Sequence, residues 1–184
     1  MNGSSDGFYA RVNADGSNLL YSTFYGGSGT GEAIRTVALN GDGHAYVAGY
    51  TTSTDLATAS AYDASHNGMY DLFVAEINPA GTGVADLVYG TYLGGSSNDF
   101  VYAIDVDESG NVYVTGNSSG DEFGTQRDYA TVKYAPDGTE LWTTSRWWSR
   151  PIGIDVAATT ESGGSSVPNN TPHSGTRFSS RTRK

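Results

Sequence analysis

Three side chains between two similar stretches of the chain are suited to binding a ligand. Tyr62, His66 and Tyr70 lie in "YTTSTDLATASAYDASHNGMY", residues 50–70. Phenol and imidazole rings can stack on a sugar or a peptide and also form hydrogen bonds. The segment is 10 residues longer than its counterpart, residues 117–127. Because a shorter segment makes the same connection, we interpret residues 50–70 as a candidate ligand-binding loop, with a neutral difference in length as the alternative.

Aspartates in glycine-containing turns are the candidate metal ligands. They are Asp15 in "NADGS", Asp42 in "NGDGH", Asp107 in "DESGN" and Asp137 in "APDGT". Oxygen ligands in such turns suit Ca²⁺, but none of these segments has the spacing of the EF-hand loop. Asp-Gly turns between strands need no metal. We therefore expect no cofactor, and calcium stays an unsupported alternative.

Glycine-rich segments and histidines give no stronger indication of chemistry. "YGGSGTGE", residues 25–32, lacks the Lys-Ser/Thr pair of a phosphate-binding loop and recurs as "LGGSSND", residues 93–99, so it is expected to be a structural turn. His44, His66 and His173 have neither metal-ligand nor general-base spacing, and we expect all three to be solvated. The chain has no cysteine, which excludes thiolate chemistry.

Carboxylates are the remaining candidates for catalysis. A pair of them could act in glycoside hydrolysis. The available side chains are Asp99, Asp105, Glu108, Asp121 and Glu122. Acidic surface residues in an acidic protein are more often solubilising, and the sequence places no two of these at a catalytic separation. We therefore expect that the chain is not an enzyme.

The distribution of charge bears on the class of partner. Residues 1–145 hold 18 acidic and 4 basic residues, whereas residues 146–184 hold 2 acidic and 6 basic residues. An acidic main body would repel phosphates, so we expect no nucleic-acid partner. The chain has no run of about 18 apolar residues, and we expect no membrane span. The first residues also lack the basic and apolar regions of a signal peptide.

The elements that must position these side chains repeat along the sequence. "DGFYARVNADG" begins at Asp6, "DLFVAEINPAG" at Asp71 and "DYATVKYAPDG" at Asp128. "NGDGHAYVAG", residues 40–49, likewise recurs as "DESGNVYVTG", residues 107–116. Alternating side chains between Asp/Asn-Gly turns are typical of short antiparallel strands. No segment has sustained helical periodicity, so no helix longer than about two turns is expected.

Four strands are expected in each full copy of the repeat. In the first copy they cover residues 7–13, 18–25, 32–39 and 44–51. We expect residues 6–49 and 71–116 to fold as two equivalent four-stranded units. About eight strands are therefore expected in residues 6–118, with two or three more up to residue 156. Tandem four-stranded repeats predict an all-β fold made of antiparallel β-propeller blades.

The expected organisation is an incomplete propeller with two full repeats and part of a third. Closed propellers need about four to eight blades. The predicted divisions are an N-terminal lead (1–5), repeat 1 with its long linker (6–70), repeat 2 (71–127), partial repeat 3 (128–156) and a disordered tail rich in Ser, Thr and Arg (157–184). An alternative for the last part is that the reading frame fails near Trp147.

A family resemblance accompanies this pattern. "DLFVAEINPAG", "LVYGTYLGGSSND", "YAIDVDESGNVYVTGNS" and "DYATVKYAPDG" resemble the bacterial seven-bladed β-propeller (SBBP) repeat family over about residues 6–143. The resemblance implies a scaffold in a large exported or cell-surface bacterial protein, and it implies no defined activity. We therefore expect a non-enzymatic scaffold or interaction module, partnered by other propeller blades. The alternatives are a carbohydrate- or protein-binding propeller, which resembles a lectin in function, and a propeller lyase or hydrolase.

Overall fold

The fold is built of strands, as the turn chemistry predicts. The computed structural model describes residues 3–120 and 124–147. Within these ranges there are ten strands and a single 3-10 turn, η1 (Gly83–Asp86). The strands are β1 (Gly7–Val12), β2 (Leu19–Tyr25), β3 (Ala33–Leu39), β4 (Ala45–Thr51), β5 (Asp71–Ile77), β6 (Leu87–Leu93), β7 (Phe100–Val106), β8 (Val112–Gly120), β9 (Gly124–Tyr134) and β10 (Glu140–Trp147). The all-β fold class is confirmed.

Some expectations fall outside the described ranges. They are any strand expected in residues 148–156 and the tail, residues 157–184. No helix in residues 3–120 and 124–147 is long and apolar enough to span a membrane.

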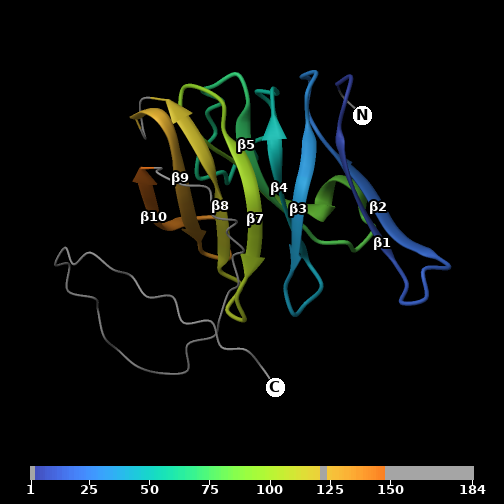
Figure 1. The fold of residues 1–184 in the computed structure, drawn as a ribbon. Coiled ribbons are helices and arrows are strands. Elements are labelled where there is room, and N and C mark those ends of the chain that lie inside the picture. The colour runs from blue at the N-terminus through green and yellow to red at the C-terminus, as the bar shows by residue number, and fades with distance from the viewer. Residues whose placement is uncertain (1–2, 121–123, 148–184) are drawn as a thin grey trace, which may run out of the picture.

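The strands form three antiparallel sheets that are not closed into a ring. β1 pairs with β2 alone, and the other two sheets have the orders β3-β4-β5-β6 and β7-β8-β9-β10. β1, β3 and β7 stand side by side, so the first strands of the two larger sheets are neighbours (Figure 1). This is the arrangement of consecutive propeller blades in an incomplete arc.

The grouping of strands into sheets corrects one expectation. Residues 6–49 do not form one four-stranded unit, and neither do residues 71–116, because each sheet combines the last two strands of one repeat with the first two of the next. The linker after β4 returns the chain to the same sheet, whereas the glycine-rich segment after β2 carries it to the next one. Turn chemistry predicts both connections but does not distinguish them.

The last residue of the repeated hairpin is glycine in both copies because the backbone of the neighbouring strand lies very close to it. Gly49 on β4 lies so close to β3 that an added Cβ would overlap the carbonyl oxygen of Ala33. Gly116 on β8 is in the same position, and an added Cβ there would overlap the carbonyl oxygen of Phe100. Only glycine permits this approach of two backbones, and so "YVAG" and "YVTG" share their last residue.

The first strands of the two larger sheets carry the same irregularity. The pairing of β3 with β4 shifts between Ile34 and Thr36, and the pairing of β7 with β8 shifts between Val101 and Ala103. Arg35 and Tyr102 are therefore the extra residues of two equivalent β-bulges. A bulge redirects the side chain at the extra position, and such bulges often occur beside functional sites.

Two apolar cores hold the arc together. One fills the space between the two larger sheets and includes Val74, Tyr89, Val114 and Tyr134. The other packs β1 and β2 on the sheet that follows and includes Phe73, whose ring centroid is 5.0 Å from that of Tyr25. Because both faces of the middle sheet are covered, every residue of β5 is buried.

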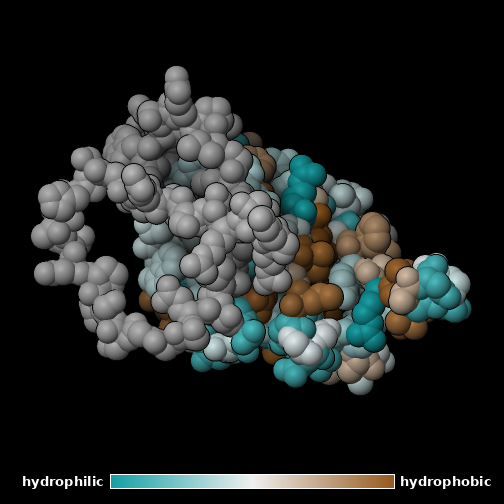
Figure 2. All heavy atoms as spheres, turned by 60° about the horizontal axis from the view of Figure 1, so that its bottom comes forward, coloured by the Kyte–Doolittle hydropathy of each residue, from teal (hydrophilic) through white to brown (hydrophobic). Residues whose placement is uncertain are grey.

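The first sheet leaves its other face uncovered. Apolar side chains of β1 and β2 that point away from the core are exposed: Phe8 (68%), Val12 (55%), Leu20 (54%) and Phe24 (59%). Figure 2 shows brown apolar residues alternating with teal polar ones over the described surface on the view that it presents. A sheet face of this composition is typical of a surface that packs against another element.

Candidate functional site

The long linker is fastened to the protein along its length. Thr58 donates its backbone N–H to the carbonyl of Gly90 at 2.9 Å, and Tyr92 donates its backbone N–H to the carbonyl of Asp63 at 3.0 Å. Both bonds lie on the edge of β6 that β5 leaves free. The linker therefore covers the outer edge of this sheet, which protects it from pairing with another chain.

The three candidate ligand-binding side chains of the linker do not converge on one site. Each packs against a different ring: Tyr62 against Tyr134 (6.3 Å between centroids), His66 against Tyr92 (5.7 Å) and Tyr70 against Tyr50 (5.6 Å). His66 Nε2 also lies 3.3 Å from the carbonyl oxygen of Thr51. The binding role of Tyr62, His66 and Tyr70 stays a prediction.

The glycine-rich segment after β2 is held by the start of the linker. The amides of residues 28–31, which in a phosphate-binding loop would face a ligand, donate to side chains instead. The bonds run from Ser28 to Asp55 Oδ1 (2.9 Å), from Gly29 to Ser53 Oγ (2.7 Å), and from Thr30 and Gly31 to Thr52 Oγ1 (both 3.1 Å). These donors are occupied, which agrees with the expected structural turn.

Two buried carboxylates organise the loops at this end of the sheets. Glu32 accepts hydrogen bonds from the hydroxyls of Thr51 (3.1 Å) and Ser53. Asp71 accepts the backbone N–H groups of Asn67 (2.6 Å) and Gly68 (2.8 Å), and burial raises the pKa of its carboxyl group. Both acids therefore have structural hydrogen-bond partners.

The candidate catalytic and metal-binding acids occupy separate places. Asp99 is buried and accepts the N–H of Gly95 at 3.0 Å. Asp107 accepts bonds from Ser109, Asn111 and Tyr113, all within its own hairpin. Among residues 3–120 and 124–147, no three His, Cys, Asp or Glu side chains are placed to hold a metal ion. Asp121 and Glu122 lie outside the described residues.

The histidines correct a further expectation. His44 Nδ1 lies 2.6 Å from Oε1 of Glu76, a residue that is only 5% exposed. Glu76 lies on β5, so the pair joins the β3–β4 hairpin to the next strand of its sheet. His44 is thus a structural partner of a buried acid and not a solvated side chain. His173 lies outside the described residues.

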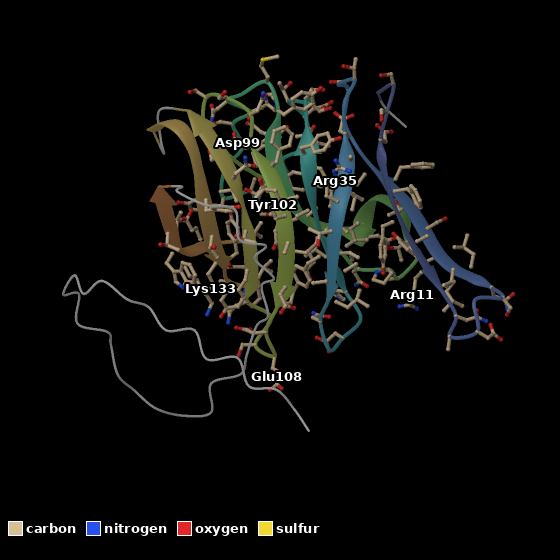
Figure 3. The ribbon with its side chains drawn as sticks, in the orientation of Figure 1. Arg11, Arg35, Asp99, Tyr102, Glu108 and Lys133 are labelled. Atoms are coloured by element: carbon tan, nitrogen blue, oxygen red, sulfur yellow. The ribbon has the colours of Figure 1, made fainter. Side chains whose placement is uncertain are left out.

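A cavity of about 450 Å³ opens between the two larger sheets beside their first strands. Its wall is formed by Arg35, Tyr50, Phe100, Val101, Tyr102 and Asn117. The two bulge residues therefore lie on the same cavity, and Figure 3 shows them on the neighbouring strands β3 and β7. Tyr70 reaches this region too, because its ring packs on the cavity residues Tyr50 and Phe100.

Polar groups of this cavity lack partners within the described part of the chain. The Arg35 guanidinium carbon lies 5.2 Å from the centre of the Tyr50 ring, a cation–π contact, and no described carboxylate pairs with it. Oδ1 of Asn117 is buried and has no hydrogen-bond donor. None of the candidate residues named from the sequence lines this cavity. Its one signal was the equivalent place of Arg35 in "AIRTVAL" and Tyr102 in "FVYAIDV".

A second cavity, of about 460 Å³, lies between β2 and η1. Two of its polar side chains are bonded to each other: Tyr21 donates its hydroxyl to Asp86 Oδ2 at 3.0 Å. Asp86 also accepts bonds from the N–H and hydroxyl of Thr82, and the hydroxyl bond lowers the pKa of Asp86 despite opposing desolvation. The two acids and the Tyr21 hydroxyl of this cavity thus already have hydrogen-bond partners within the protein.

Comparison with known proteins identifies one family. No curated protein matches this chain. Residues 88–124 match the SBBP family, which is described as a beta-propeller repeat. The matched segment runs from β6 through β8, so it crosses from one sheet into the next. It contains nearly all of two of the four segments that carry the resemblance, "LVYGTYLGGSSND" and "YAIDVDESGNVYVTGNS". The family that this chain matches is therefore the SBBP beta-propeller repeat, over residues 88–124.

Proposed function

We propose that this chain is a non-enzymatic β-propeller scaffold or interaction module, whose direct partners are further propeller blades. The observation that carries this proposal is the incomplete first sheet. β5–β6 and β9–β10 are each extended by the hairpin that precedes them, whereas no described strand pairs with the free edge of β1. The uncovered apolar face of β1 and β2 adds a surface for a neighbouring blade.

We further propose that the chain is part of a larger exported or cell-surface bacterial protein. This proposal follows from the resemblance to the repeat family, which implies such proteins. The non-enzymatic assignment is supported by the buried acids, since Glu32, Asp71 and Asp99 all hold loop backbone or hydroxyl groups. A lyase or hydrolase would need a pair of acids free to face a substrate.

A second candidate function is carbohydrate or protein binding. The cavity beside Arg35 favours it, because it combines a cation, exposed aromatic surface and an unsatisfied acceptor.

Extending the chain by one hairpin tests the scaffold proposal. Residues 94–127 contain the hairpin that extends the sheet of β9 and β10, so we would fuse a copy of residues 94–127 directly ahead of Asp6. The added hairpin should pair with the free edge of β1 and raise the melting temperature by several degrees. Amide exchange of β1 should slow at the same time.

A matched control separates pairing from the effect of a longer chain. Val114→Pro in the fused copy removes a donor in the strand that would pair with β1, and it should abolish the stabilisation. Equal melting temperatures for the fusion and the original chain, or equal stabilisation by the proline-containing fusion, would contradict the proposal.

A further inference from the structure

We propose that the cavity between the bulges of β3 and β7 binds a uronic acid residue of an acidic glycan. This inference makes the second candidate function specific and does not depend on assembly with other blades. The cavity, of about 450 Å³, lies between two sheets whose relative placement is set by a buried core. It is therefore a largely preformed site on a rigid framework.

The bulges place two different groups at equivalent positions on the same cavity. Arg35 and Tyr102 are both extra residues in the first strand of a sheet, and both side chains are exposed. In Figure 3 they come from the adjacent strands β3 and β7. One bulge thus supplies a cation and the other supplies an aromatic ring that is 52% exposed. Together they can contact a charged group and an apolar surface of one ligand.

Arg35 specifies a carboxylate. Its guanidinium rests over the Tyr50 ring at 5.2 Å, which orients the planar donor group. No described acid pairs with Arg35, and among the residues that line the cavity it alone is charged. A guanidinium binds a carboxylate through two parallel hydrogen bonds. Since the chain as a whole is strongly acidic, the attraction must be local, with the carboxylate directly at Arg35.

Asn117 specifies a hydrogen-bond donor on the same ligand. Asn117 is one of the residues that line the cavity and is 8% exposed, yet its Oδ1 accepts no hydrogen bond. An unsatisfied buried acceptor costs free energy that a ligand hydroxyl can recover. A hexuronate carries a carboxylate, several hydroxyls and a C–H face that can stack on Tyr102. It therefore satisfies Arg35, Asn117 and the exposed ring at once.

The test is binding of trigalacturonate to the full chain, with neutral galactotriose as the matched probe. Calorimetry and amide chemical-shift mapping should show binding of trigalacturonate, with shifts at Arg35, Tyr102 and Asn117. Galactotriose should bind at least about tenfold more weakly, the equivalent of losing one charge-assisted contact. Arg35→Gln should weaken trigalacturonate binding by about tenfold or more and remove the preference over the neutral sugar.

Two further variants test which groups of the ligand the cavity recognises, and a third is a control. Arg35→Lys keeps the charge without the planar donor pair and should recover only part of the affinity. Tyr102→Leu should weaken both probes, because it removes the stacking surface. Arg11→Gln, which removes an arginine on β1 away from the cavity, should leave binding unchanged.

Several outcomes would overturn the proposal. They are absence of binding by trigalacturonate, equal binding by the two sugars, and unchanged binding in Arg35→Gln. Tighter binding of a triglutamate peptide than of trigalacturonate would assign the cavity to acidic peptides instead. None of these results bears on β1, so they are distinguishable from failure of the hairpin-fusion experiment.

Discussion

The hydroxyl of Tyr21 donates a 3.0 Å hydrogen bond to Oδ2 of Asp86 and so joins the first sheet to the second. Tyr21 lies on β2, and Asp86 ends the η1 turn ahead of β6. The residue Asp86 is only 4% exposed, and the other bonds to its carboxylate come from Thr82 and Gly83 within its own turn. The contact is thus a polar link between sheets that otherwise meet through an apolar core.

Removing this link should loosen the first sheet. Tyr21→Phe keeps the ring but leaves Asp86 without its donor from β2, so we expect the melting temperature to fall by a few degrees. Tyr9→Phe is the control, because the neighbouring ring of Tyr9 packs 6.0 Å from that of Tyr21 and its hydroxyl makes no hydrogen bond with the described residues. Thermal unfolding, monitored by circular dichroism, gives the melting temperature of each variant. An equal fall in Tyr21→Phe and Tyr9→Phe would contradict a role for the Tyr21 hydrogen bond.

The same acid makes stability depend on pH. The hydrogen bond from the Thr82 hydroxyl is the largest influence on the pKa of Asp86, and it holds the pKa below the ordinary value of 3.8. A lowered pKa in the folded state stabilises the protein above the unfolded pKa, and this contribution is lost as the pH falls through the folded pKa.

Asp86→Asn should therefore melt at a lower temperature than the original chain at neutral pH. The difference should shrink as the pH falls from about 5 to about 2, where protonated Asp86 resembles asparagine. Melting temperatures across this range test the prediction, and a difference that stays constant would show that the charge of Asp86 does not matter.

Glycine at the end of the repeated hairpin should be indispensable. Gly49→Ala or Gly116→Ala drives a methyl group into the carbonyl oxygen of Ala33 or Phe100, so each should destabilise the protein strongly or prevent folding. Gly41→Ala is the matched control, since an added Cβ there meets nothing within 4 Å. Soluble yield and urea unfolding compare the three variants, and a Gly49→Ala protein as stable as Gly41→Ala would refute the close approach.

The anchoring of the long linker gives another test. The Tyr92 hydroxyl accepts the N–H of Leu56 at 2.9 Å and donates to the carbonyl of Ser53 at 2.7 Å. Tyr92→Phe leaves both backbone groups unpaired in a buried place, at a cost of about 1–3 kcal/mol. Urea unfolding should report this loss, and exchange of the Leu56 amide should quicken. Unchanged exchange would mean that the linker does not depend on Tyr92.

Local sequence patterns predicted the strands and the repeat but not the assignment of strands to sheets. Asp-Gly turns and alternating side chains are local, and they placed eight strands before residue 121, as expected. Whether β2 or β5 lies in the same sheet as β4 depends on how two non-hairpin segments cross the molecule. The bonds that direct them, such as Asp55 to Ser28 and Asp63 to Tyr92, join residues 27 or more positions apart.

The candidate sites also differ in whether local sequence or long-range contacts define them. Tyr62, His66 and Tyr70 drew attention through residue type and loop length, yet their surroundings depend on rings from three different strands. Arg35 and Tyr102 were not among the candidates from the sequence, because a bulge is a property of the pairing between strands. Apart from the equivalent places of Arg35 and Tyr102 in their strands, the cavity has no sequence signature, and the unsatisfied Asn117 has none.

The pairing of β4 with β5 in solution tests most directly whether each sheet combines strands of two consecutive repeats. Ala48 and Val74 face each other in this pair, and Val37 and Val47 do so in the pair of β3 with β4. Nuclear Overhauser contacts between the α-protons of paired strands should therefore join residues 45–51 to both residues 33–39 and residues 71–77. Cross-strand contacts that join residues 19–25 to residues 33–39, with none from residues 45–51 to residues 71–77, would instead show that each repeat forms its own sheet.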